Sequence, residues 1–409
     1  MDYRTYDPDR DLDAVRRIWY ETGWTQPGKE EHMDLFLAAG RTLVADVAGE
    51  AECLVNTMPG TIRYLDTDLG FSAVAAVTTS RPARKQGLAR RLTAQAVALD
   101  AADGKLVAGL GMFEQGYYNQ LGFGTGPYEH IVAFDPAQLD IQVKPRVPRR
   151  ITRDEAALVH AARLVRLHGH GSINITPVEM TQSAMQQMDN GFGLGYCDGP
   201  TGELTHHLWC TTKAVERGPY FVAWLVYQTR DQFLELMALL QSLGDQVRLV
   251  RMLEPQGIQL QDLLRHPFRG RVATRGSNFE HGIRATAYWQ IRILDLPGCL
   301  AHTHLSSGPV RFNLRLTDPI ADSLDDGAPW SGVAGDYVVT LGPASHAEAG
   351  TDETLPTLAA GVGAFSRMWL GVRPASGLAY TDELAGPAEL LEQLDAVLRL
   401  PEPKLGWEI

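Results

Sequence analysis

The residues with the clearest chemical potential lie between positions 77 and 92, where a run rich in Val and Thr is followed by a basic turn. Within it, Arg84-x-x-Gly87-x-Ala89 follows the pattern Arg/Gln-x-x-Gly-x-Gly/Ala. If a helix begins here, its first backbone N–H groups lack partners and its dipole adds partial positive charge. Gly87 and Ala89 would let phosphates approach the backbone, and Arg84 and Lys85 would add charge. The pattern predicts a pyrophosphate site, and its alternative is an ordinary basic amphipathic helix start.

A second stretch, Glu-Gln-Gly-Tyr-Tyr-Asn-Gln-Leu-Gly-Phe, occupies residues 114–123. A positioned tyrosine hydroxyl can donate a proton to a leaving group. The alternative interpretation is an aromatic helix that packs in the core. Because this stretch follows the basic turn in order, the two motifs together are more specific than either alone.

The elements around these motifs alternate between strands and helices, which favours an α/β sheet. In the first part of the chain we predict strands at 42–47, 51–55, 71–79 and 105–112, and helices at 11–20, 84–100 and 115–121. Three prolines in residues 135–150 indicate a linker, because proline interrupts regular structure.

Residues 150–292 repeat the order of strand, helix and strand, which suggests a degenerate internal duplication. We predict helices at 154–167, 231–243 and 258–264, a hairpin of 192–196 with 204–211, and strands at 221–227 and 247–253. In residues 293–409 we predict strands at 310–316 and 336–341 and helices at 355–370 and 387–400.

Charge and composition exclude several classes of protein. The chain of 409 residues has 37 Lys and Arg against 49 Asp and Glu, a net charge of −12. This argues against nonspecific nucleic-acid binding and fits a cationic ligand better. We expect no secretory signal and no membrane span. We also expect no zinc site or disulfide framework, because the four cysteines form no C-x-x-C pair. The histidine pairs at 168/170, 206/207 and 302/304 have no acidic or cysteine partner at a convincing spacing, so no metal is expected.

The whole chain resembles the Eis-type (enhanced intracellular survival) acetyltransferases, which are GCN5-related N-acetyltransferases (GNAT). The resemblance is most specific at the run 84–89 and at Tyr118, within the family's aromatic-Tyr-x-x-x-Gly-Phe signature. In the last part of the chain the resemblance is based on Ile293-Leu-Asp-Leu-Pro297 and on Val362-Gly-Ala-Phe-x-x-x-Trp-Leu-Gly371. It implies an α/β (α+β) fold with an acetyl-CoA-binding GNAT domain over 1–135, a degenerate GNAT-like domain over 150–292 and a sterol-carrier-protein-like domain over 293–409.

The resemblance also implies roles for particular residues. The backbone of Val77 and Thr79 would pair with the pantetheine amides of acetyl-CoA, the co-substrate. Tyr118 would be the general acid toward the thiolate, and the terminal carboxylate on Ile409 the general base. The residues implied to hold the pyrophosphate are Arg84, Lys85, Gln86, Gly87, Leu88 and Ala89.

The implied acceptor is a primary amine on a cationic molecule: an aminoglycoside, a polyamine or a lysine side chain. Glu21, Trp24 and Glu408 are candidates for its binding, because carboxylates attract ammonium groups and Trp offers a cation–π face; their alternative is solvated charges and a packed ring. Family members assemble as hexamers, so the resemblance implies a hexamer for this chain. We also expect a cytoplasmic protein. Two alternatives remain open: a transferase for a peptide-like metabolite, and a non-catalytic protein that binds CoA or an apolar ligand.

The sequence departs from the family in two places. Phe113 stands where many members have the serine of Ser-Glu-Gly-Gly, which contacts CoA in those proteins. The chain ends in Gly-Trp-Glu-Ile, whereas family members often end in Phe, so the side chain that anchors the terminus differs.

Overall fold

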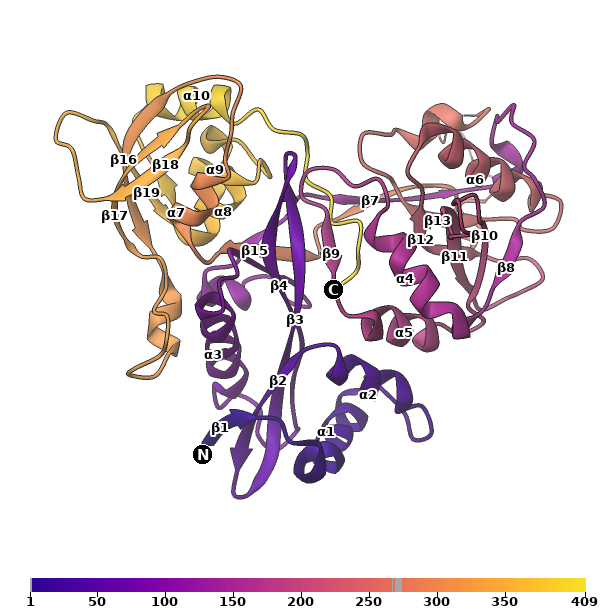
Figure 1. Ribbon diagram of the computed structural model, residues 1–409, viewed down its shortest axis with the longest axis horizontal. Helices are drawn as coiled ribbons and strands as arrows, with labels where there is room; N and C mark the ends of the chain where they lie inside the picture. The colour runs from indigo at the N-terminus through magenta and orange to yellow at the C-terminus, as the bar shows by residue number, and fades with distance from the viewer. Residues whose placement is uncertain (1, 267, 269–273) are drawn as a thin grey trace.

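The computed structural model describes residues 2–266, 268 and 274–409. The chain forms three β-sheets with their helices, arranged around a centre in which the C-terminus lies (Figure 1). The mixed α/β class predicted from the sequence is therefore confirmed. In the described parts of the chain, no helix is both long enough and apolar enough to cross a bilayer.

The first sheet has the order β1-β2-β3-β4-β5-β15-β6, and β9 pairs with β3. Its strands are β1 (Asp2–Thr5), β2 (Arg41–Val47), β3 (Glu50–Tyr64), β4 (Thr67–Thr79), β5 (Val107–Gly111), β6 (Gly124–Thr125), β9 (Ile173–Ile175) and β15 (Trp289–Ile293). Alternation along β2 sends Leu43 and Ala45 to one face and Val44 to the other. Consequently α3 (Leu88–Ala102) covers one face, and α1 (Pro8–Thr22) and α2 (Glu31–Ala38) cover the other.

The second sheet has the order β14-β7-β13-β12-β11-β10-β8. Its strands are β7 (Glu129–Phe134), β8 (Arg149–Ile151), β10 (Phe192–Tyr196), β11 (His206–Thr212), β12 (Tyr220–Val226), β13 (Val250–Leu253) and β14 (Gly282–Thr286), and its helices are α4 (Ala156–Leu164), α5 (Val178–Gln187) and α6 (Arg230–Ser242). The predicted hairpin is confirmed, since β10 and β11 are antiparallel with Phe192 opposite Cys210. A capping box at Thr229 begins α6 where the sequence predicts a helix.

The third sheet has the order β18-β17-β16-β19-β20. Its elements are β16 (Val310–Thr317), β17 (Gly335–Leu341), β18 (His346–Ala349), β19 (Thr357–Gly361), β20 (Leu384–Ala385), α7 (Leu296–Ala301), α8 (Val362–Trp369), α9 (Ala375–Thr381) and α10 (Ala388–Val397). The helix predicted over 355–370 is wrong in its first half, where β19 runs parallel to β16. The small apolar residues of β19 lie between two strands and lack a polar alternation, so their sequence does not distinguish them from a helix.

Several short elements are 3₁₀ turns. The helix predicted over 258–264 is wrong, because only the 3₁₀ helix η4 (Leu260–Leu263) forms there. The short helix predicted over 115–121 is likewise the 3₁₀ helix η1 (Tyr118–Leu121). The remaining 3₁₀ helices of the described chain are η2 (Pro136–Gln138), η3 (Arg153–Glu155) and η5 (Pro319–Ser323).

The first and second sheets exchange strands across the predicted domain limits of 1–135 and 150–292, whereas the strands of the third sheet all lie within 293–409. Strand β7 pairs with β13 and β14 of the second sheet, whereas β15 lies between β5 and β6 of the first. Arg292 in β15 forms a fully buried ion pair with Asp318 at the start of η5 (2.6 Å). These links fix the three sheets relative to one another and define the space between them.

Candidate active site

The first feature of the site is a gap between β4 and β5. The two strands pair in parallel only along Phe71–Val74 of β4. Beyond that point β5 stays with β15, and β4 continues beside β3 with a register shift. Ala76 at this irregularity has a φ of +51°. Among the described residues, the edge of β4 over residues 75–79, which includes Val77 and Thr79, therefore has no strand partner on the β5 side. Its backbone groups are available to an extended ligand.

The turn after β4 opens onto the N-terminus of α3. Gly87 caps the helix with a φ of +78°, and apart from its chain neighbours no atom of the described residues lies within 4 Å of the position that a Cβ would occupy. No side chain in that part of the structure caps the helix, so its first N–H groups remain available to an anion. Arg84, Lys85 and Gln86 are exposed around this end, while the Leu88 side chain is buried in the core and offers only its backbone.

Glu21 lies at this turn and does not line the cavity described below. Its carboxylate accepts the backbone N–H of Arg81 (2.7 Å), and the Arg81 guanidinium donates to the Glu21 carbonyl (3.1 Å). The structure therefore connects Glu21 from α1 to the turn that begins α3. Ala89, in the first turn of α3, is half-buried.

A cavity of about 990 Å³ lies between the first sheet, the second sheet and the end of the chain. Ligand cavities in proteins usually hold about 300–1,000 Å³. The predicted site residues that share it are Trp24, Val77, Tyr118, Glu408 and Ile409. The structure thus brings residues from the start, the middle and the end of the chain to one space.

Of the two adjacent tyrosines, Tyr118 lines this cavity and Tyr117 does not; Tyr227 and Tyr288 line it elsewhere. Tyr118 is buried at the start of η1. Its ring packs edge-on against the ring of Tyr117, with 4.9 Å between the ring centroids. Burial raises the pKa of the Tyr118 hydroxyl above its ordinary value, and the nearby Tyr117 and Cys53 act in the same direction. The hydroxyl is therefore protonated at neutral pH.

The last residues of the chain are held firmly between the two sheets. Trp407 is buried, and its ring centroid lies 3.6 Å from the guanidinium carbon of Arg163. The Leu405 carbonyl accepts the N–H of Ile173 in β9 (2.9 Å). A buried ion pair adds to this anchor, with Lys404 Nζ 3.5 Å from Glu129. In this chain Trp407 provides the anchoring aromatic ring near the terminus.

This anchor places Ile409 directly beside β5. A Cβ added to Gly111 would lie 2.5 Å from the Ile409 carbonyl oxygen and 3.5 Å from its carbon. Gly111 and Tyr118 both line the cavity. The end of the chain and the Tyr118 hydroxyl therefore border the same space, next to the gap between β4 and β5.

The cavity also contains residues that the sequence analysis did not select. Arg163 and Arg166, from α4 and the turn after it, and Trp224 from β12 all line it. The sequence does carry one signal, because two arginines three residues apart interrupt an otherwise apolar helix. Only the packing of the second sheet against the end of the chain shows that these arginines face a cavity.

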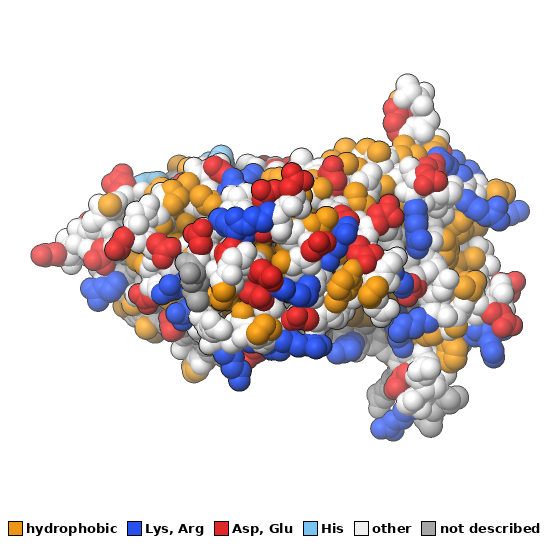
Figure 2. Space-filling view, turned by 90° about the horizontal axis from the view of Figure 1, so that it is seen from below, with side chains coloured by type: hydrophobic (Ala, Val, Ile, Leu, Met, Phe, Trp, Pro, Cys, Tyr) orange, Lys and Arg blue, Asp and Glu red, His pale blue; other side chains and the backbone are white. Residues whose placement is uncertain are grey.

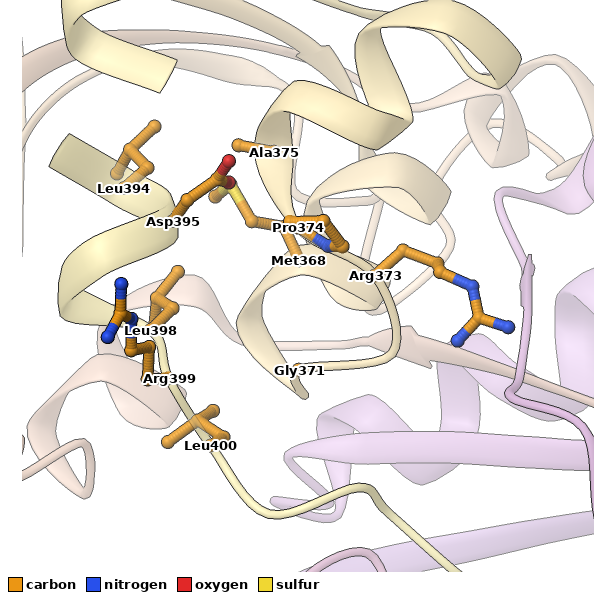
Figure 3. Close-up of a pocket in the computed structure, with 10 residues that line it drawn as sticks. All are labelled: Met368, Gly371, Arg373, Pro374, Ala375, Leu394, Asp395, Leu398, Arg399 and Leu400. Atoms are coloured by element: carbon orange, nitrogen blue, oxygen red, sulfur yellow. The ribbon is translucent and has the colours of Figure 1, made fainter. Parts of the chain in front are cut away.

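A second cavity lies within the third part of the chain, around the end of α8 and the start of α9 (Figure 3). It holds about 190 Å³, less than typical ligand cavities. Asp395 lies in it and accepts the N–H of Ser376 (3.2 Å), while the Arg373 side chain extends away from the other labelled side chains. This small, partly polar space provides little support for binding of a large apolar molecule.

Charges on the molecular surface are mixed. On the face shown in Figure 2, acidic and basic side chains are interspersed among apolar ones. The charges relevant to the site are instead those of the acidic and basic side chains that line the cavity: Arg163, Arg166, Arg284, Lys404, Glu129, Glu254 and Glu408.

Comparison with known proteins gives a result at the level of fold. No protein-family model matches the chain, and no curated protein matches its sequence. Solved structures match along its full length. A probable N-acyltransferase from Enterococcus faecalis has a TM-score of 0.79 at 15% identity, covering 100% of this chain and 99% of that one. A GCN5-related N-acetyltransferase from Anabaena variabilis has a TM-score of 0.79 at 12% identity, covering 100% of both chains.

The fold of the whole chain is therefore that of GCN5-related N-acetyltransferase structures. Among the similar structures is Eis1 from Mycobacterium abscessus, with a TM-score of 0.74 at 14% identity and 100% of both chains covered. The predicted resemblance to Eis-type proteins is confirmed as a likeness of fold over the full chain.

Proposed function

We propose that this chain is an N-acetyltransferase that moves an acetyl group from acetyl-CoA to a primary amine. The observation that supports this most strongly is one cavity that joins the free edge of β4 at Val77 to the Tyr118 hydroxyl and to Ile409. The donor site fits acetyl-CoA, because Gly87 leaves open space before the helix and Arg84 is exposed beside it. Acetyl-CoA would supply the acyl thioester.

The residues of the chain would manage the protons of this reaction. An amine with a pKa near 10 is mostly protonated at neutral pH, so the Ile409 carboxylate first accepts a proton from it. The nitrogen then attacks the acyl carbon directly and forms a tetrahedral intermediate. As this intermediate collapses, the carbon–sulfur bond breaks and Tyr118 donates its hydroxyl proton to the leaving sulfur. The second proton of the nitrogen restores Tyr118, so one proton is released in each turnover. The raised pKa of Tyr118 keeps it in the acid form that this role requires.

The acceptor proposed from the resemblance is an aminoglycoside, a polyamine or a lysine-like amine, and a peptide-like metabolite is the alternative. Trp24, exposed by 44%, and Glu408 line the cavity and would contact such an amine. Assembly as a hexamer remains part of the proposal by resemblance.

The experiment is thiol release from acetyl-CoA by untagged protein with a panel of these amines. Tyr118→Phe should bind acetyl-CoA normally in calorimetry and lose turnover by about 10²- to 10⁴-fold, the usual contribution of a general acid. The control is Tyr117→Phe, since Tyr117 does not line the cavity. Unchanged turnover in Tyr118→Phe would reject the acid role, and no thiol release with any amine would reject the transferase.

A further inference from the structure

Two buried arginines line the cavity, and their hydrogen bonding differs sharply. Arg166 makes three hydrogen bonds: its guanidinium donates to the carbonyls of Arg163 (2.7 Å) and Ile173 (2.8 Å) and to Asn174 Oδ1 (2.5 Å). The Arg163 guanidinium makes one hydrogen bond within the described residues, to Thr181 Oγ1 (3.2 Å). A guanidinium carries five N–H donors, so Arg163 retains donors for another group.

Arg163 is also held in a fixed orientation. Its guanidinium carbon lies 4.3 Å from the ring centroid of Trp224 and 3.6 Å from that of Trp407. The guanidinium carbon lies over both rings, which cannot accept in-plane hydrogen bonds, so the N–H donors not bonded to Thr181 can serve another group. The planar edge of a guanidinium matches a carboxylate, which can accept two parallel bonds.

No carboxylate in the described chain forms an ion pair with Arg163, although this residue is only 4% exposed to solvent. Glu408 interacts with Arg163 only through the electrostatic attraction of their charges, and Glu408 is itself exposed. Burial lowers the pKa of Arg163, as expected for a cation without a close counter-ion. Buried charges in proteins are normally paired, so a bound anion would complete this environment.

We propose that Arg163 binds a carboxylate of the acceptor, which would therefore be a small amino-acid-like molecule rather than a polycation. This inference rests on the proposed transferase function. Trp407 touches Arg163, and Ile409 follows two residues later, so the Cα atoms of residues 407 and 409 lie at most about 7 Å apart. A molecule of amino-acid size can place its carboxylate at Arg163 and its amine near Ile409. Phe36 and Phe221 on the cavity wall favour an apolar side chain or stem on this molecule.

The test compares matched amines that differ only at the anionic end: phenylalanine with phenylalaninamide, and Nα-acetyl-lysine with Nα-acetyl-lysinamide. Wild-type protein should favour each carboxylate by about 10- to 100-fold in kcat/KM, the range expected for a hydrogen-bonded ion pair. Arg163→Gln should reduce this preference to near one. Because each ratio is compared between wild type and variant, differences in amine pKa between the paired compounds cancel.

Control variants separate binding from a purely structural role. Arg284→Gln removes an exposed cation of the same cavity and should keep the wild-type preference. If Arg163 only supports the end of the chain, Arg163→Gln will slow both members of a pair equally, which would overturn the proposal. Arg163→Lys keeps the charge but lacks the planar edge, and an intermediate preference is expected even if the Gln variant does not fold.

Failure of this inference is distinguishable from failure of the proposed function. Thiol release with polyamines or amides at least equal to that with the carboxylates would reject the carboxylate site and retain the transferase. No thiol release with any amine would reject the transferase. Calorimetry with phenylalanine and CoA then tests the site alone, and binding that Arg163→Gln does not weaken would reject it.

Discussion

The contact between Gly111 and the end of the chain makes a sharp prediction for Gly111→Ala. The added Cβ would lie 2.5 Å from the Ile409 oxygen, whereas ordinary contacts begin near 3.4 Å, so that oxygen must move by about 1 Å. In the described chain no atom outside Ile409 lies within 4 Å of this Cβ position. The change therefore perturbs the last residue and leaves the packing of the strand intact.

The expected result is a loss of activity without a loss of stability. A displacement of about 1 Å in a catalytic group costs on the order of 10²-fold in rate. Stability should change by less than about 1 kcal/mol, because only the residues after the Trp407 anchor need to move and alanine suits a strand better than glycine. The assay is kcat from thiol release, with thermal unfolding measured on the same samples.

The matched control is Gly70→Ala in β4, where a Cβ meets its nearest neighbour at 3.6 Å. This variant should keep wild-type kcat. Equal activities of Gly111→Ala, Gly70→Ala and wild type would refute the idea that the position of Ile409 matters for transfer. A large drop in melting temperature for Gly111→Ala would instead refute the local account of the clash.

Three further results are expected. Trp407→Ala should cost about 3–5 kcal/mol of stability, as large core truncations do, and should also reduce kcat. Trp407→Phe should retain much of the stability and much of the kcat, as measured by thermal unfolding and thiol release. Gly87 and Gly104 both have a left-handed backbone and open space around them, so Gly87→Ala and Gly104→Ala should each lower the free energy of unfolding by about 1–2 kcal/mol. Only Gly87→Ala should also weaken CoA binding, by roughly 10-fold in calorimetry. Burial lowers the pKa of His207 to about 3, so the free energy of unfolding should fall as pH decreases from 6.5 toward 3, because the unfolded state takes up the proton first. Denaturant titrations of His207→Asn across this range should show a weaker pH dependence, and an identical dependence would contradict the assignment.

The turn and helix start that we propose for the acetyl donor could be predicted from local chemistry. The run from Arg84 to Ala89 contains its own signals, since glycine permits the left-handed cap and basic residues flank the helix start. Tyr118 was likewise indicated by its local signature, and the structure places it on the cavity with Val77. The helix itself begins at Leu88 rather than at Arg84, because the residues before it form the turn.

The acceptor side was not predictable, because it depends on contacts between distant segments. Arg163 and Trp224 belong to the second sheet, and nothing near them in sequence indicates that they meet Trp407. The exchange of β7 and β15 between sheets has the same cause: each strand pairs by tertiary position, which periodicity does not reveal. Glu21, predicted to bind the amine, accepts a hydrogen bond from the turn before α3, a contact that its local sequence does not indicate.

The arrangement explains why residues at the end of the chain would matter to chemistry in the first sheet. The buried pair of Arg292 with Asp318 connects the first sheet to the third, and Lys404 with Glu129 connects the last residues to the second. Breaking one partner of such a pair leaves an unpaired buried charge, which is strongly unfavourable. The position of Ile409 is therefore determined by contacts of the last residues with the first and second sheets. Its distance from β5 depends on how these two sheets are packed. Changes far from the cavity, such as loss of Asp318, should then reduce transfer by shifting this geometry as well as by lowering stability.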